Sequence, residues 1–447
     1  MVKKNDLVKV EITETNNLGS GVGRTEGQVH FVVGACEGDT VVARVMKVTK
    51  SYIVSKIESI EIASPHRITP DCPVSGKCGG CVYRHVSMAH EKELKEKAVE
   101  NLLRQAGVSA RVLPLITPVT ERYRNKVQYP TQNGKAGYYR QNSHAVVACE
   151  DCLLQPVIFS EITASVMAFV NENGISCYDE ESGKGFLRHI YLRTNKDESE
   201  ILLTLVVTNE KLANKDSFIE RITQKFPQIK GILLSVNKKE GNVILGDTFI
   251  TLWGKDSITD SLLGCTFDIS APSFYQVNHD ATETLYSIAA EMADIKEGDR
   301  VADLFCGIGT IGICLCHNKK IASLVGIEII PEAVENAKKN ALRNGMENAE
   351  FYCGDANHPA LSDADIIIVD PPRKGLEKEL IETIAKINSR KVVYISCNPA
   401  TLARDLAIFQ NVGYAVGDVQ PVNLFPRTAH CECAVALTRC VNVDMRR

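Results

Sequence analysis

Cys397 is the residue of this chain whose position most strongly suggests chemistry. It follows the hydrophobic run Lys391–Ser396, and Asn398-Pro399 interrupts that run before a helix-like segment. The pattern predicts a strand that ends at the thiol, and open α/β sheets place their reacting groups at the carboxyl ends of strands. Because a thiolate is a strong nucleophile, the sequence indicates covalent catalysis by Cys397, with a buried and inert cysteine as the alternative.

A second group of cysteines has the pattern of metal ligands. Cys72, Cys78 and Cys81 fall within one short segment, and Cys149 and Cys152 follow downstream. Thiols at this spacing could hold an iron–sulfur cluster, and a tetrahedral zinc ion or unligated thiols are the alternatives. The spacing alone leaves open whether Cys149 or Cys152 is the fourth ligand.

A glycine-rich loop and three acids indicate a nucleotide-like cofactor. The segment DLFCGIGTIG (303–312) ends a predicted strand and opens a helix, and a loop of this kind could also bind a dinucleotide. Glu328, Asp355 and Asp370 end the next three predicted strands. Such a series of polar strand tips resembles the S-adenosylmethionine-dependent methyltransferase fold rather than a dehydrogenase. Glu328 would accept the ribose hydroxyls, Asp355 would suit the adenine amine, and Asp370 the methionine or the target base.

The elements that position these residues change in character along the chain. Residues 1–60 show period-2 alternation between glycine turns, which predicts a small β-barrel. Residues 66–140 carry a surplus of Lys and Arg interleaved with tyrosines, a mixture that suits phosphate neutralisation and base stacking. Residues 125–265 predict an α+β region dominated by an antiparallel sheet, with a helix at DSFIERITQKF. From about residue 280, strict strand–helix alternation predicts a parallel, doubly wound sheet.

Composition limits the function classes. The 447 residues include 51 Lys and Arg against 55 Asp and Glu, so a nucleic-acid partner would need a local basic surface. The N-terminus lacks the apolar stretch of a signal peptide, and no apolar run is long enough to cross a membrane. Sixteen cysteines in such a chain favour thiols, metal or a cluster over a disulfide framework. We expect a cytoplasmic enzyme, monomeric, with no membrane partner.

Seven motifs together carry a family resemblance over nearly the whole chain, in order: CPVSGKCGGC, EDCLLQ, FYQVN, DLFCGIGTIG, DPPRKG, SCNPATLARDL and HCECAVALTR. They resemble the RNA uracil-5-methyltransferase family, and most of all its bacterial 23S ribosomal RNA members. The resemblance implies an N-terminal RNA-binding TRAM barrel, an S-adenosylmethionine-dependent Rossmann-like domain at the C-terminus and a 23S rRNA substrate. It also implies a [4Fe–4S] cluster on Cys72, Cys78, Cys81 and, through the Cys-x-Leu-Gln pattern, Cys152.

The same resemblance assigns roles to single residues. Cys397 matches the nucleophile and Glu432 the general base. Thr310 stands where some relatives have an asparagine. The residues that match contacts to S-adenosylmethionine are Gln276, Phe305, Glu328, Asp355 and Asp370.

The predicted organisation is multidomain. Residues 1–60 form the barrel, 61–92 the iron–sulfur segment, 93–270 the central α+β RNA-binding region, and 271–447 the methyltransferase domain. The tRNA-directed relatives are expected to lack the cluster and the barrel, which favours rRNA over tRNA. A non-catalytic RNA-binding assembly factor is the third alternative, and an intact Cys397, Glu432 and glycine loop disfavour it.

Overall fold

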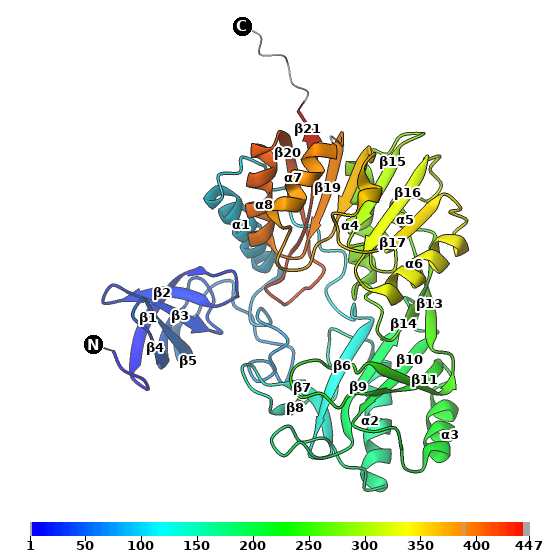
Figure 1. Cartoon of the computed structure of the whole chain (residues 1–447). Helices are drawn as coiled ribbons and strands as arrows, with labels where there is room; N and C mark the ends of the chain where they lie inside the picture. Colours follow the sequence, from blue (N-terminus) through cyan, green and yellow to red (C-terminus); the bar gives the residue numbers. More distant parts are fainter. Residues whose placement is uncertain (1, 388, 441–447) are drawn as a thin grey trace.

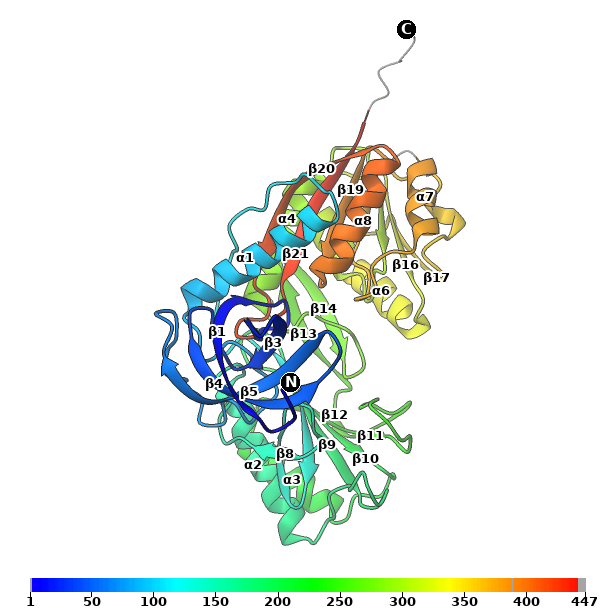
Figure 2. The same cartoon turned by 90° about the vertical axis from the view of Figure 1, so that its left-hand side faces the viewer.

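The computed structural model describes residues 2–387 and 389–440. A small barrel, a central sheet and a C-terminal sheet form three distinct parts, and the barrel lies to the side of the two larger ones (Figures 1 and 2). Among the helices of these residues, none combines the length and the apolar character that a membrane crossing requires. The multidomain fold predicted from the sequence is confirmed.

The N-terminal barrel closes in the strand order β1-β2-β3-β5-β4. Its interior holds the side chains that alternate along each strand, such as Val10, Ile12, Val32, Val41 and Ala43. This alternation is the pattern expected when one face of a strand is buried and the other meets water. The strands are β1 (Leu7–Thr15), β2 (Gly21–Thr25), β3 (Gln28–Val33), β4 (Thr40–Val48) and β5 (Tyr52–Ile62).

The central part is a seven-stranded sheet in the order β12-β11-β10-β9-β6-β7-β8. All neighbouring strands are antiparallel except β10 and β11, so the antiparallel character predicted for this region is confirmed. The helix predicted at DSFIERITQKF is α3 (Lys215–Lys225), but α2 (Val157–Glu172) was not predicted. The strands are β6 (Lys126–Gln132), β7 (Lys135–Tyr139), β8 (Val146–Ala148), β9 (Leu187–Thr194), β10 (Ile201–Val207), β11 (Ile229–Val236) and β12 (Thr248–Gly254).

The C-terminal sheet has the order β17-β16-β15-β18-β19-β21-β20. Its first five strands are parallel, as the strand–helix alternation predicted, and β21 is antiparallel to both of its neighbours. The strands are β15 (Arg300–Leu304), β16 (Ser323–Glu328), β17 (Ala349–Cys353), β18 (Ile366–Val369), β19 (Lys391–Ser396), β20 (Tyr414–Val422) and β21 (Glu432–Arg439). The helices are α4 (His279–Ala293), α5 (Thr310–Cys316), α6 (Pro331–Arg343), α7 (Lys378–Ile387) and α8 (Pro399–Asn411).

Two segments connect these parts. Helix α1 (Met88–Gln105) packs against α8 of the C-terminal part, and both views show the two helices side by side. Beyond α1, Val112 and Ile116 form parallel bridges to β20. The hairpin of β13 (Ser257–Leu262) and β14 (Cys265–Ser270) packs into the same core as α4 and α5. The domain boundaries stated above, after residues 60, 92 and 270, stay predictions.

Candidate active site

The parallel sheet creates a cleft where its strand order reverses. Strand β15 pairs with β16 on one side and with β18 on the other, so the loops after these strands separate at this point. The cleft has a volume of about 760 Å³, which is in the range of small-molecule sites. Its walls come from the loops after β15, β16, β18 and β19, from β6, and from residues 274–277 before α4.

The glycine loop is held against a buried acid. The backbone N–H of Gly312 donates to Asp303 Oδ2 at 2.8 Å, and a Cβ at position 312 would lie 2.8 Å from that oxygen. Glycine is therefore required for helix α5 to approach β15 this closely. Burial raises the pKa of the Asp303 carboxyl to about 7, with a smaller contribution from Asp370. Gly309, with φ of 83°, takes the left-handed conformation at the turn into α5.

Glu328 lies at the tip of β16 with its carboxylate oriented by the backbone. Its Oε2 accepts from the N–H of Gly307 at 3.1 Å, and its Oε1 from the N–H of Ile330 at 3.0 Å. The neighbouring side chain of Ile329 is 68% exposed and lines the cleft. A fixed acid beside an apolar ledge suits a ribose and the purine attached to it. These residues therefore fit the nucleoside of S-adenosylmethionine.

Three further residues predicted to contact the methyl donor line the same cleft. Gln276 is buried, and its backbone carbonyl accepts from Asn125 Nδ2 at 3.0 Å, which fixes this segment against β6. Phe305 has φ of 63°, an uncommon conformation for an aromatic residue, and such strain concentrates at functional sites. Desolvation raises the pKa of the Asp370 carboxyl to about 7.

Asp355 differs from the other predicted contacts. It follows β17, is exposed, and is not among the residues that line the cleft. Its Oδ1 accepts from the backbone and side-chain nitrogens of Asn357 at 2.9 and 3.0 Å. Its contact with the methyl donor therefore stays a prediction.

Strand register brings Cys397 and Glu432 together. Ser396, the last residue of β19, pairs with Cys433 of the antiparallel strand β21. Cys397, which follows Ser396, and Glu432, which precedes Cys433, are therefore neighbours at this end of the sheet. Both line the cleft. Glu432 is 2% exposed, and burial raises the pKa of its carboxyl well above the usual value, with Asp370 adding to the shift. Burial first, and then the charges of Glu432 and Asp370, raise the pKa of the Cys397 thiol to about 11.

Arg373 is a candidate site residue that was not predicted from the sequence. It lines the cleft, and its positive charge opposes the upward pKa shifts of both Cys397 and Glu432. Asn398 orients its loop by donating from Nδ2 to the Arg373 carbonyl at 2.9 Å, while its Oδ1 accepts from Ala400 N at the start of α8. Arg373 lies within the DPPRKG motif that marked Asp370, so its place in that motif was a usable signal.

A buried network positions the loop that carries the start of β21. Lys95 on α1 donates to Glu91 Oε1 at 2.9 Å, to Asn423 Oδ1 at 2.8 Å and to the Phe425 carbonyl at 3.2 Å. Glu91 in turn accepts from the backbone N–H of Arg427 at 2.9 Å. In the sequence Glu91 and Lys95 have the spacing of an ordinary surface ion pair on a helix. Their burial instead ties α1 to the chain that leads into Glu432.

The central sheet presents polar and charged side chains to the cleft. Lys126 and Gln128 lie on one face at the start of β6, Arg124 lies two residues before the strand, and all three line the cleft. Burial, followed by the charges of Arg193 and Arg124, lowers the pKa of Lys126 to about 8. The basic surface predicted from residues 66–140 thus contributes two cations to the wall of the cleft.

The cysteines predicted to hold a metal surround a separate cavity of about 160 Å³. Burial is the largest cause that raises the pKa of Cys78, and it raises those of Cys81 and Cys149 to about 12. Partly buried thiols that line one cavity fit a thiolate-bound metal group, which would remove their protons. All five cysteines line the cavity: Cys72, Cys78, Cys81, Cys149 and Cys152.

The chain is similar to known proteins over its whole length. A TRAM domain model matches residues 2–57, and a methyltransferase domain model matches residues 295–419. An uncharacterized RNA methyltransferase of Halalkalibacterium halodurans is 40% identical over 449 residues, covering 98% of each chain. Another, of Clostridium acetobutylicum, is 40% identical over 453 residues with the same coverage. The crystal structure of Pyrococcus abyssi tRNA (uracil-54, C5)-methyltransferase with S-adenosyl-L-homocysteine matches with a TM-score of 0.80 and 26% identity, over 96% of this chain and 99% of that one.

Proposed function

The chain belongs to the RNA uracil-5-methyltransferase family and is an S-adenosylmethionine-dependent RNA methyltransferase, and we propose that it methylates C5 of specific uridines in 23S rRNA through a covalent adduct on Cys397. The single observation that carries the mechanism is the register of β19 and β21. It sets a thiol beside a buried carboxyl at the edge of a cleft large enough for both substrates.

The chemistry explains why these two groups are needed. C5 of uracil is too weak a nucleophile to take a methyl group directly. Addition of the Cys397 thiolate at C6 converts C5, C4 and O4 into an enolate, and C5 then attacks the methyl group of the sulfonium donor. Glu432 removes the C5 proton, and the C6–S bond breaks to restore the ring and the thiolate. A carboxyl whose pKa is raised by burial is a base strong enough for this step.

The charges around Cys397 bear on how its thiolate forms. Glu432 and Asp370 oppose ionisation of the thiol, and Arg373 favours it. A sulfonium bound in the cleft would add a second positive charge near the sulfur. We infer that thiolate formation is coupled to methyl-donor binding, so the resting enzyme keeps Cys397 protonated.

We also propose a [4Fe–4S] cluster on Cys72, Cys78, Cys81 and Cys152. Support comes from the five thiols that line one cavity. Three of them lie in the segment after the barrel and two in the segment before α2. A cluster there would fasten these two segments together near Arg84 and Arg124. Anaerobic protein should be brown and contain about four iron and four sulfide per chain. Cys152→Ser should lose the absorbance and the iron, whereas Cys149→Ser should keep both; a colourless zinc protein would refute the cluster.

The choice of 23S rRNA over tRNA rests on the likeness of the motifs. The barrel was expected to disfavour tRNA, but a tRNA methyltransferase aligns with 96% of this chain, so the barrel does not distinguish the two substrates. The tRNA substrate is therefore the second candidate. In both cases the uridine must leave its stack to reach the cleft. We further propose that the enzyme acts as a monomer in the cytoplasm.

The experiment that tests the function is methyl transfer from labelled S-adenosylmethionine. Undermodified 23S rRNA should be labelled at C5 of uridine, and unmodified tRNA transcripts should not. Cys397→Ala should abolish transfer, and Glu432→Gln should accumulate a protein–RNA adduct because the C5 proton stays in place. Cys353→Ala, which removes an exposed cysteine, is the matched control and should behave as wild type. Normal turnover by Cys397→Ala would overturn the mechanism, and label in tRNA alone would overturn the substrate.

A further inference from the structure

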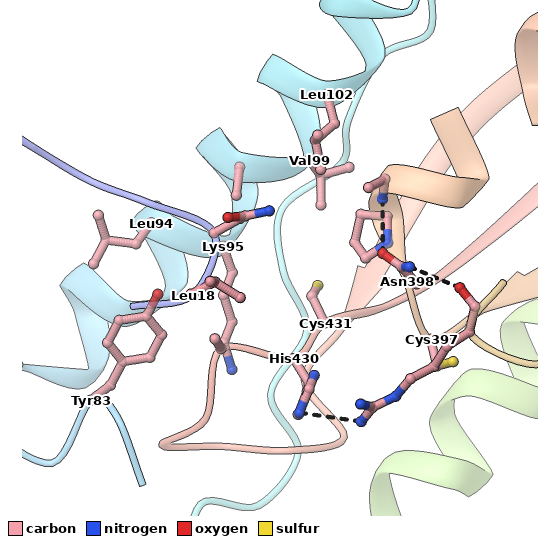
Figure 3. Close-up of a pocket in the computed structure, with 16 residues that line it drawn as sticks. Leu18, Tyr83, Leu94, Lys95, Val99, Leu102, Cys397, Asn398, His430 and Cys431 are labelled. Atoms are coloured by element: carbon pink, nitrogen blue, oxygen red, sulfur yellow. Dashed lines mark hydrogen bonds between the residues drawn. The ribbon is translucent and has the colours of Figure 1, made fainter. Parts of the chain in front are cut away.

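Cys397 borders a second hollow besides the main cleft. This smaller hollow has a volume of about 200 Å³ and shares Cys397, Arg373 and His430 with the cleft. Figure 3 shows it between α1, with Leu94, Val99 and Leu102, and the segment that holds Cys397 and Asn398. An RNA strand that passes Cys397 therefore meets two recesses, the main cleft and the smaller hollow.

The hollow has one apolar wall and one polar wall. The mainly apolar wall consists of α1 side chains at helical spacing, including Leu94, Ala98 and Val99, with Lys95 among them. Opposite them lie Arg373 and His430, whose side-chain nitrogens are 3.4 Å apart. An apolar surface facing planar cationic and aromatic groups suits a nucleobase, which has two faces that stack and an edge that forms hydrogen bonds.

The barrel closes the hollow with an exposed leucine. Leu18 is 70% exposed and lines the hollow at the tip of the turn between β1 and β2. The turn is rigid, because Asn16 Oδ1 accepts from the N–H groups of Leu18 at 3.0 Å and of Ser20 at 2.9 Å. The turn also packs closely against the segment that follows the barrel, because a Cβ on Gly19 would lie only 2.8 Å from Val82 Cγ2. The leucine is thus held over the hollow rather than folded into the barrel core.

We propose that this hollow binds the base of the nucleotide directly adjacent to the methylated uridine. The inference rests on the proposed function, since the target ring occupies the main cleft on the other side of Cys397. The two recesses share Cys397, Arg373 and His430, so two consecutive nucleotides of an unstacked strand can fill them together. The hollow has about a quarter of the volume of the cleft, which suits one planar ring system and excludes a base pair. The barrel would then select RNA by gripping a neighbour of the target.

The test uses a substitution that fills the hollow and, separately, RNAs that lack the base proposed to bind there. Ala98→Phe places a ring inside it, and Glu100→Phe, on the exposed face of the same helix, is the matched control. The RNA is the 23S rRNA segment that wild type methylates, either intact or with an abasic residue 5′ or 3′ of the target. With intact RNA we expect Ala98→Phe to raise KM roughly 10-fold with little change in kcat, and Glu100→Phe to match wild type.

The abasic RNAs provide the specific readout. One of them should raise the KM of wild type by a similar factor, and Ala98→Phe should add nothing further on that RNA, because the two changes remove the same contact. The proposal would be overturned if Ala98→Phe raised KM by the same factor on intact RNA and on both abasic RNAs. It would also be overturned if Ala98→Phe left the KM for intact RNA unchanged. Transfer by wild type to intact RNA is read first. Its absence would refute the proposed function, and the proposal for the hollow would fall with it.

Discussion

Neutralising Glu432 should make the Cys397 thiol easier to ionise in the free enzyme. The pKa of this thiol is raised from 9.0 to about 11, with burial as the largest cause and Glu432 as the second. At pH 8 this leaves about 0.1% thiolate, against roughly 9% for an unperturbed thiol. Glu432→Gln keeps the shape of the side chain and removes the carboxylate charge, so it should lower the pKa of the thiol, by roughly one unit for a single nearby charge.

The assay is alkylation by iodoacetamide from pH 7 to pH 11, followed by mass spectrometry of the peptide that contains Cys397. We expect the midpoint to fall by about one unit in Glu432→Gln. The rate at pH 8 should rise only about 3-fold, because a thiolate of lower pKa is also a weaker nucleophile. Exposed Cys353 in the same digest is the internal reference.

An unchanged or higher midpoint in Glu432→Gln would refute the electrostatic coupling between the two residues. The same alkylation assay with two bound ligands tests separately whether a positive charge in the cleft reaches the thiol. S-adenosylmethionine, with its sulfonium charge, should lower the midpoint more than S-adenosylhomocysteine, which is neutral at sulfur. Equal effects of the two ligands would show that the donor charge does not reach the thiol.

Three further predictions concern stability. Gly312→Ala should lower the free energy of unfolding by about 1–3 kcal/mol and weaken S-adenosylhomocysteine binding in calorimetry, because its Cβ meets Asp303 Oδ2 at 2.8 Å; an unchanged melting temperature would contradict this. Lys95→Met should cost about 3 kcal/mol in urea unfolding, because buried Glu91 loses its cation at 2.9 Å and keeps only Arg427 at 3.6 Å; an unchanged urea midpoint would contradict this. The pKa of Asp370 is about 7 when folded and lower when unfolded, so its contribution to stability is full below pH 4 and is lost as pH rises towards 7. Asp370→Asn should flatten that part of the pH–stability curve, and an unaltered slope would refute the shift.

Local pattern was enough to predict the five parallel strands of the C-terminal sheet, but not the antiparallel strands β20 and β21. Runs such as Ile366–Val369 are apolar on both faces and end at polar residues, which is the signature of a buried parallel strand. Helix α2 was missed for a related reason. Its sequence, VIFSEITASVMAFVNE, is rich in β-branched residues and buried around much of its circumference, so it lacks the polar stripe that identifies a helix.

The candidate site depends on contacts that spacing does not encode. Cys397 could be predicted from its position after a strand. Glu432 was predicted only from the family resemblance, because the register of β21 against β19 is a tertiary property. Lys95 and Asn423 are hydrogen-bonded across more than three hundred residues of sequence. No local signal marks such a pair, whereas Arg373 could have been found from its place beside Asp370.

Strand β21 makes the proposed catalytic pair depend on assembly of the sheet. It lies between β19 and β20 and carries Glu432, so the carboxyl reaches the thiol only once this strand has paired with β19. A molecule in which β21 is not yet inserted would hold the proposed nucleophile without the proposed proton acceptor. It could form the methylated adduct but not release it, so correct pairing of this one strand is a condition for turnover.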